Sequence, residues 1–148
     1  MKNMRVLIDT NIVLDWLLKR KPFQENAEYI MEKSMFADVD AYLTAHSLSD
    51  LFYILRKDFD VQKRKKLLLL LCDRLGIIAE DKDIIKFVLQ NEAWNDLEDG
   101  LQMRCADVEN LDYIVTRNIK DFSDSKVMAI LPEQFIALYE AQQTVKNR

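Results

Sequence analysis

The side chains of this chain that could do chemistry are almost all carboxylates. The 148 residues include 25 acidic side chains but a single histidine, His46, and two cysteines. This inventory excludes a zinc site of the usual histidine–cysteine kind and offers little choice for a cysteine–histidine nucleophile. The two glycines, Gly76 and Gly100, stand alone, so neither a Walker loop nor a dinucleotide fingerprint can be built. Any catalysis must therefore come from carboxylates.

Five aspartates fall at positions that a parallel α/β sheet would bring together. Asp9 directly follows an apolar segment, and Asp50 lies on the helix after the second predicted strand. Asp96 and Asp99 begin a later helix, and Asp121 follows the next strand. Ligands of such sheets bind outside the carboxyl ends of the strands, so these acids could converge on one pocket. Taken singly, each also fits an ordinary role as a helix cap, a turn cap or a solvated helix residue.

Short apolar segments alternate with segments of helical periodicity along the chain. They predict an α/β fold with a central, mainly parallel sheet flanked by helices, in a single domain over residues 1–148 with its core at 4–139 and a polar C-terminal tail. The near-continuous apolar run Val6–Ile8 predicts an internal strand. Gly76 is expected to end a helix in a left-handed conformation. Strands are predicted over residues 4–8, 41–45, 77–79, 113–116 and 128–131, and helices over 12–18, 23–36, 60–75, 82–91 and 132–143, with two more starting at Ser47 or Ser49 and at Asp96.

Charge and hydropathy limit the classes of function. The net charge of −4 argues against a module that binds nucleic acid by charge alone, but it is compatible with a nuclease whose acids hold cations. Basic residues cluster at 19–21 and 56–57, where they are candidates for contacts with the backbone of a nucleic acid. A third cluster at 63–66 is more simply explained as a solvated helix face. We see neither a signal peptide nor a membrane-spanning stretch, and we expect a cytoplasmic protein.

The acidic residues belong to short sequence motifs. These are VLIDTN at 6–11, SLSDL at 47–51, DLEDGLQ at 96–102 and YIVTRNIKDF at 113–122, followed by LPEQF at 131–135. In this order and spacing, the motifs resemble those of the PIN domain, the fold of VapC-type toxin ribonucleases and other RNA-processing nucleases. The resemblance extends from residue 4 to about residue 139. It implies a three-layer PIN-like fold.

The resemblance also implies a set of acids that bind Mg²⁺ or Mn²⁺. Asp9 matches the first acid of the family and Asp99 the third. Asp50 takes the second place, where the family usually has the longer glutamate. The usual place of the fourth acid falls on Asn118, which is not acidic, and Asp121 is expected to substitute from three positions later.

Further residues and partners follow from the same resemblance. Asp96 is expected as an additional metal ligand, and Asn11, Thr116 and Asn118 are expected to orient the acids or the substrate. An antitoxin protein is a possible partner, and a homodimer is expected. The helix that carries Leu67–Leu71 is apolar all round, which fits a dimer interface, although burial within the monomer would explain it as well.

These observations predict a metal-dependent endoribonuclease. Two carboxylates about 4 Å apart repel by about 4 kcal/mol at an effective dielectric of ~20, so converging acids need protons or a cation. Hard oxygen ligands suit Mg²⁺ or Mn²⁺, which would activate water for hydrolysis of an RNA phosphodiester bond and leave a 5′-phosphate and a 3′-hydroxyl. The predicted catalytic residues are Asp9, Asp50, Asp99 and Asp121.

Two other classes of protein compete with this prediction. A phosphatase of the haloacid dehalogenase kind also has an aspartate after its first strand, but it needs a second acid where this chain has Asn11. The second class is a PIN-fold protein that binds RNA or a partner without cleaving. It is supported by Asp50 and Asn118, which differ from the acids that the family usually has at these two places. Cleavage assays with and without metal would separate this binding protein from the enzyme.

Overall fold

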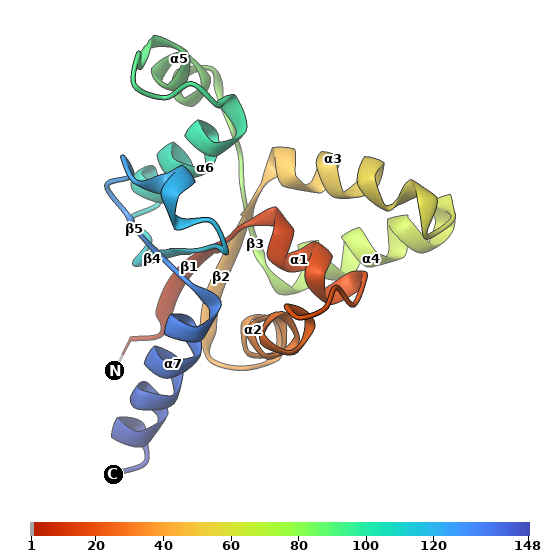
Figure 1. Ribbon diagram of the computed structural model, residues 1–148, viewed down its shortest axis with the longest axis vertical. Helices are drawn as coiled ribbons and strands as arrows, with labels where there is room; N and C mark the ends of the chain where they lie inside the picture. The colour runs from red at the N-terminus through yellow and green to blue at the C-terminus, as the bar shows by residue number, and fades with distance from the viewer. Residues whose placement is uncertain (1) are drawn as a thin grey trace.

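The structure, a computed structural model, describes residues 2–148 and is built on a parallel sheet (Figure 1). The sheet order is β3-β2-β1-β4-β5, and all pairs are parallel. Val6 in the middle of β1 lies opposite Ala41 of β2 and Tyr113 of β4. The predicted internal position of the first strand is therefore confirmed. The strands are β1 (Met4–Ile8), β2 (Val39–Thr44), β3 (Gly76–Ile78), β4 (Tyr113–Val115) and β5 (Met128–Ile130).

Helices connect the strands, and two short 3₁₀ turns complete the described part of the chain. The helices are α1 (Thr10–Leu17), α2 (Gln24–Phe36), α3 (Ala45–Ile54), α4 (Val61–Arg74), α5 (Lys82–Gln90), α6 (Leu97–Val108) and α7 (Pro132–Lys146), and the turns are η1 (Leu55–Lys57) and η2 (Ile119–Phe122). Among residues 2–148, no helix combines the length and the apolar character that crossing a bilayer requires.

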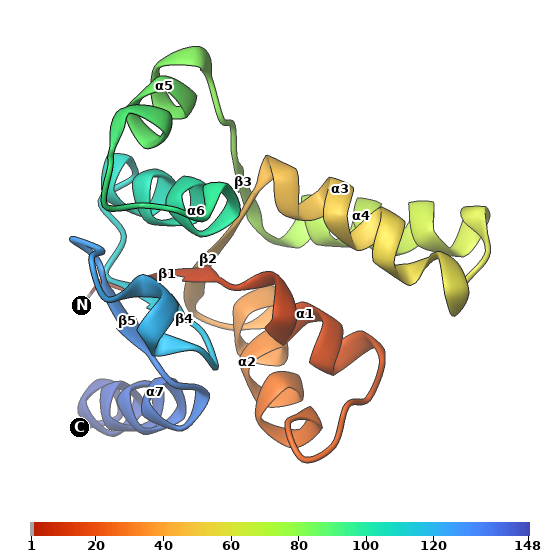
Figure 2. The same cartoon turned by 45° about the horizontal axis from the view of Figure 1, so that its top comes forward.

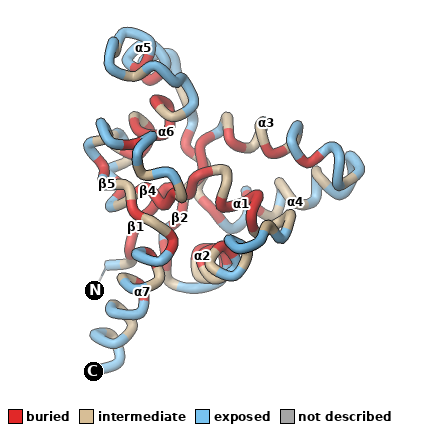
Figure 3. The backbone as a smooth tube through the Cα atoms, viewed as in Figure 1, coloured by how far each residue is buried: buried red, intermediate tan, exposed pale blue. Residues whose placement is uncertain are grey.

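The sheet is buried on both faces, which gives the three layers that were predicted. Val6 and Ile8 of β1 pack into a core with residues of α1, α2, α4 and α7. Leu7, pointing the other way, packs with residues of α5 and α6. Figure 3 shows the buried backbone concentrated in the strands and in the helix faces turned toward them. Burial on both faces is the reason that these strands read as apolar runs rather than as alternating ones.

Two local predictions were wrong, each for a physical reason. The third helix begins at Ala45, directly after β2, and its N-cap residue Thr44 makes no side-chain capping bond, so neither Ser47 nor Ser49 opens it. Gly76 does not end a helix in a left-handed conformation, because no glycine in residues 2–148 has a positive φ. It is the first residue of β3, where a Cβ atom would collide with the ring of Tyr42.

The helices α3 and α4 form an antiparallel pair that projects from the body of the molecule (Figure 2). We call this pair, with the residues that connect it, the α3–α4 arm (45–74). Of the five leucines at 67–71, Leu71 is buried, whereas 63% of the Leu69 side chain is exposed. The other three leucines are partly buried. Much of the apolar surface of α4 therefore lacks cover from the described residues.

Candidate active site

Asp9 is the first residue beyond β1 and is only 6% exposed. Its Oδ2 atom accepts a hydrogen bond from Thr116 Oγ1 at 2.8 Å, directly after β4, and its Oδ1 atom accepts one from Gln102 Nε2 at 3.4 Å, on α6. Asp9 occupies the N-cap position of α1, yet its side chain makes no capping hydrogen bond. Its carboxylate therefore points into the space between β1, β4 and α6 rather than stabilising the helix start.

The charge on Asp9 has little compensation from the protein itself. Burial raises its pKa above the ordinary value, and the hydrogen bonds from Thr116 and Gln102 offset only part of that rise. Among residues 2–148, no lysine or arginine forms an ion pair with it. The Oε1 atom of Gln102 is also buried and has no hydrogen-bond partner among these residues. An unpaired oxygen beside a buried carboxylate is a suitable environment for a cation.

A second group of acids surrounds the start of α6. Asp96 caps this helix, because its Oδ1 atom accepts a hydrogen bond from the backbone N–H of Asp99 at 2.9 Å. Asp96, Asp99 and Asp121 line one surface pocket. Burial, followed by the nearby charges of Asp96, Asp121, Asp9 and Glu98, raises the pKa of Asp99 to about 6. The structure thus brings together four of the predicted acids.

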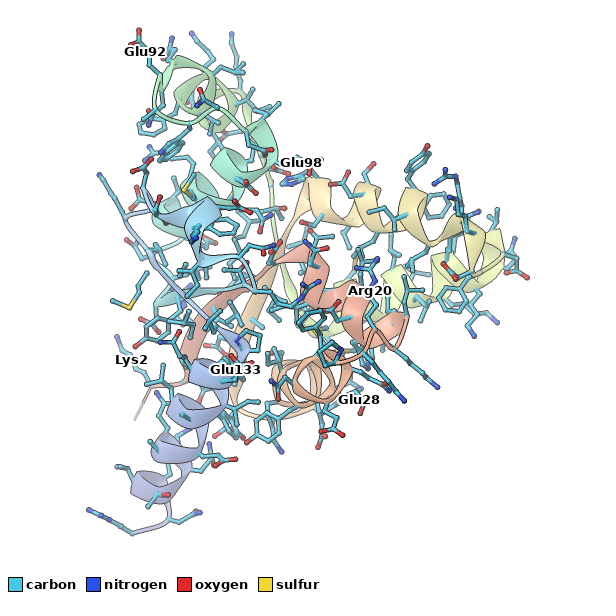
Figure 4. The ribbon with its side chains drawn as sticks, in the orientation of Figure 1. Lys2, Arg20, Glu28, Glu92, Glu98 and Glu133 are labelled. Atoms are coloured by element: carbon cyan, nitrogen blue, oxygen red, sulfur yellow. The ribbon has the colours of Figure 1, made fainter. Side chains whose placement is uncertain are left out.

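Asp50 is grouped with two residues that the sequence did not single out. Ligand atoms of His46, Asp50 and Glu98 lie within 4.8 Å of one another, a spacing that could hold a metal ion. Figure 4 labels Glu98 at the start of α6, across from the start of α3. Burial and the adjacent Asp50 carboxylate raise the pKa of Glu98. The structure therefore extends the acidic region from α6 to α3 through Glu98.

His46 is held in a fixed orientation by Glu80, which follows β3. The backbone N–H of His46 donates to Glu80 Oε1 at 2.6 Å, and its Nδ1 atom lies 2.6 Å from Glu80 Oε2. Thr44 Oγ1 lies 3.0 Å from the same ring nitrogen. The Nε2 atom is buried and has no hydrogen-bond partner in the described chain. A carboxylate behind a histidine commonly orients that ring toward a metal, so His46 is a further candidate ligand that the sequence analysis did not single out.

A chain of hydroxyl groups fixes the start of α3 against the start of α1. Thr10 Oγ1 donates to Ser47 Oγ at 2.8 Å, and Ser47 Oγ lies 2.8 Å from Thr44 Oγ1. Ser47 and Thr44 are buried, so these hydrogen bonds are shielded from water. The network therefore fixes the position of His46 and Asp50 relative to Asp9.

The two predicted asparagines lie near this region, and the backbone of Asn11 hydrogen-bonds to Asp9. Asn118 is exposed, and its backbone N–H donates to Thr116 Oγ1 at 3.0 Å. Asn11 is a half-buried residue in the first turn of α1. Within residues 2–148, neither amide side chain forms a hydrogen bond with Asp9 or Asp99. Asn118 instead supports the hydroxyl that holds Asp9.

All of these groups lie outside the carboxyl ends of the strands. They gather where the chain leaves β1 toward β2 on one side and where β4 joins β1 on the other, which is the switch point of the sheet. The donor atoms are carboxylate, amide and hydroxyl oxygens with one imidazole nitrogen, a set that suits Mg²⁺ or Mn²⁺.

Comparison with known proteins assigns the family. A sequence model described as PIN domain matches residues 5–120. The chain belongs to the PIN domain family. Comparison with curated proteins gives no match.

Solved structures share the fold. A toxin–antitoxin complex from Klebsiella pneumoniae is similar with a TM-score of 0.65 and 22% identity, covering 86% of this chain and 97% of that one. VapBC2 from Rickettsia felis, bound to a DNA fragment from its promoter, is similar with a TM-score of 0.60 and 20% identity. The match covers 86% of this chain and 98% of that one. VapC20 of Mycobacterium tuberculosis, a toxin that cleaves the sarcin–ricin loop, is similar with a TM-score of 0.59 and 8% identity. The match covers 74% of this chain and 86% of that one.

Proposed function

We propose that this chain is a Mg²⁺- or Mn²⁺-dependent endoribonuclease. The observation that supports this most strongly is Asp9, a buried carboxylate that faces the acids of α6 and has no neutralising lysine or arginine among residues 2–148. A divalent ion bound there would remove the repulsion and supply an activated water and a counter-charge for the phosphodiester.

Each residue of the chain has a distinct role in this proposal. Asp9 and Asp99 are the central ligands, and Asp96 and Asp121 complete the set from the pocket at α6. Thr116 holds the Asp9 carboxylate in place through its hydroxyl. Hydrolysis adds water across the P–O3′ bond, so the attacking oxygen stays on the 5′-phosphate and a proton ends on the 3′ oxygen.

Asp50 acts from α3, across the candidate site from Asp96 and Asp121. It sits beside His46 and Glu98, and this group would accept a second cation or a metal-bound water. The shorter reach of aspartate at this place, where the family usually has glutamate, is then compensated by neighbours that supply further ligand atoms. Asn11 and Asn118 would contact the substrate.

The biological setting that we propose is a toxin–antitoxin pair acting in the cytoplasm. Support comes from the similar solved structures, which include toxin–antitoxin complexes and a toxin that cleaves the sarcin–ricin loop of RNA. An adjacent reading frame for a small DNA-binding protein would be the expected genetic companion. Co-expression of that protein should abolish RNA cleavage by this chain.

A second candidate is a PIN-fold protein that binds RNA or a protein partner without cleaving. Asn118 favours it, because an amide occupies the place of the fourth acid. This candidate and the enzyme differ in a direct assay. Only the enzyme shortens RNA, and only when a divalent metal is present.

The decisive experiment compares Asp9→Asn with the wild type in RNA cleavage with Mg²⁺, with Mn²⁺ and in EDTA. Loss of a residue that only orients a metal ligand typically costs 10–100-fold, so loss of a central ligand should reduce cleavage by at least about a hundredfold. Asp73→Asn, the same change at an exposed residue of α4, is the matched control and should cleave normally.

Two results would refute the enzyme. Cleavage by the wild type that persists in EDTA would exclude the metal dependence. An Asp9→Asn variant as active as the wild type would show that cleavage does not need the charge of Asp9, since asparagine keeps the size of the side chain and removes only the charge.

We also propose a homodimer that covers the apolar surface of α4. Leu69 is largely exposed, and its neighbours at 67, 68 and 70 are only partly buried. Sedimentation at micromolar concentration should give about twice the chain mass of 17.5 kDa, and Leu69→Lys should return the monomer. A 17.5 kDa species for the wild type would contradict the dimer.

A further inference from the structure

We propose that the exposed face of α3 and η1 is a binding track for single-stranded RNA that leads into the candidate active site. This inference rests on the proposed ribonuclease function and adds the surface that holds the substrate. Asp50 and Tyr53 are three positions apart on α3 and share one side of the helix, and Lys57 in η1 follows four positions later. Leu51 and Leu55 are buried on the opposite side.

Tyr53 has the properties of a platform for a nucleobase. Its side chain is 62% exposed, and the guanidinium of Arg56 lies 3.7 Å from the centre of its ring. Arg56 is itself anchored, because its Nη1 atom donates to the backbone oxygen of Tyr53 at 2.8 Å. The ring is thus supported by a cation while most of its surface faces solvent. Arginine-supported aromatic rings of this kind stack unpaired bases with little preference for sequence.

The charge of this segment is opposite to that of the rest of the chain. Residues 52–66 contain six basic and two acidic side chains, although the whole chain carries a net charge of −4. Within residues 2–148, none of these six basic residues forms a salt bridge, whereas Arg20, Arg104 and Arg117 elsewhere do. Cations that an acidic protein leaves unpaired are available for phosphates.

The arm is arranged so that bound RNA would run toward the acids. At 1.5 Å per residue, Tyr53 lies about 4.5 Å and Lys57 about 10 Å along the axis from Asp50, within the span of neighbouring nucleotides. Arg64 of α4 donates to the backbone oxygen of Phe52 at 2.7 Å and so keeps the basic part of α4 against α3. Figures 1 and 2 show the arm projecting away from α5 and α6.

The track can be tested by binding rather than by cleavage. The probe is a short, fluorescently labelled single-stranded RNA added to the Asp9→Asn protein, with fluorescence anisotropy as the readout and a gel to verify that the RNA stays intact. Tyr53→Ala should weaken binding about tenfold, and Tyr53→Phe should bind normally because the ring is retained. A blunt RNA duplex of the same length should bind more weakly, because its bases are already stacked.

The chain offers matched controls for both chemical changes. Phe36 is equally exposed at 62% and has the guanidinium of Arg74 4.9 Å from its ring centre, so Phe36→Ala removes a similar pair elsewhere and should bind normally. Lys57→Gln should reduce the slope of log Kd against log salt by about 0.7, the value for one contact to a single strand. Lys86→Gln, the same change at an exposed site on α5, should leave the slope unchanged.

Failure of the track and failure of the enzyme give different results. If the wild type cleaves RNA but Tyr53→Ala binds as tightly as Phe36→Ala, the track is refuted and the enzyme stands. If the wild type never cleaves but the Tyr53 and Lys57 effects are found, the track stands and the enzyme is refuted. A Tyr53→Ala protein that keeps RNA binding but loses its dimer or a protein partner would assign this surface to protein contacts and overturn the track. Equal unfolding midpoints for all variants are required before the comparison.

Discussion

Asp9 and Asp15 are six positions apart and both are buried, yet they differ in whether a cationic side chain pairs with them. Asp15, on α1, is 1% exposed and accepts two hydrogen bonds from Arg117, at 2.7 Å from Nε and 3.2 Å from Nη2. Arg20 adds a third cationic contact at 3.8 Å. Within residues 2–148, Asp9 receives neutral donors, among them Thr116 and Gln102, and no cation pairs with it. One carboxylate is neutralised from within the chain, and the other is not.

The difference shows how to separate structural acids from functional ones in an acidic protein. A buried ion pair with good hydrogen bonds needs nothing from solution, so Asp15 is explained by the fold. A buried carboxylate without a cation costs stability unless a proton or a metal compensates it. Asp9, at the carboxyl edge of the sheet, therefore carries a cost in stability that its contacts within residues 2–148 do not offset.

The largest effect is expected when the structural acid is changed. Asp15→Asn removes the charge that pairs with Arg117 and Arg20, and we expect the free energy of unfolding to fall by about 3 kcal/mol. For a chain of this size, that corresponds to a melting temperature lower by roughly 10 °C. Calorimetry would measure it, with Asp73→Asn as the control at an exposed position. A variant as stable as the wild type would remove the basis of the comparison.

The next largest effect is the stabilisation of the fold by a divalent metal, which should depend on Asp9 and not on Asp15. Mg²⁺ at about a hundred times its Kd should stabilise the wild type by about 2.7 kcal/mol relative to EDTA. Asp15→Asn should show the same increment on a lower baseline, whereas Asp9→Asn should show none. In EDTA, Asp9→Asn should be at least as stable as the wild type, because a buried charge has been removed. An equal increment in all three proteins would place the metal elsewhere.

The smallest effect is a pH dependence at Asp99. Its pKa in the folded chain, about 6, lies above the ordinary value of 3.8, so the folded state holds this proton more tightly than the unfolded state does. In EDTA, stability should therefore fall as the pH rises from about 4 to about 6, by an amount limited because Asp99 is partly exposed. Asp99→Asn should match the wild type at pH 4 and exceed it at pH 7 in denaturant unfolding. A constant difference across this range would contradict the shift.

Much of the fold follows from local sequence. The apolar run Val6–Ile8 predicted an internal strand because burial on both faces leaves no alternation to see. Asp96 was predicted as a helix cap, and it is one, because capping depends only on residues within one turn. The start of α3 was missed because Thr44 belongs to β2 and caps nothing with its side chain. The role of Gly76 was missed because it depends on Tyr42 of a neighbouring strand.

The residues of the candidate site also fall into two groups, those that local sequence predicts and those that only tertiary contacts bring into the site. Asp9, Asp99 and Asp121 could be proposed from motif order, because each follows a strand or begins a helix. Gln102 has a weak signal, since it lies three positions after Asp99 and so shares its side of α6. His46 has no such signal, because its significance comes from Glu80, which only the pairing of β2 with β3 brings within 2.6 Å. Local sequence patterns could not predict contacts between segments that follow different strands.

The hydrogen bond from Thr116 to Asp9 joins residues 107 positions apart, and this separation determines when the candidate site can form during synthesis. During synthesis, the first strand and its carboxylate leave the ribosome long before β4 and η2 exist. Parallel pairing over such a distance is among the slower events of folding. A growing chain therefore passes through most of its synthesis with Asp9 exposed and its partners missing. The acids of the candidate site therefore converge only after most of the chain has been made.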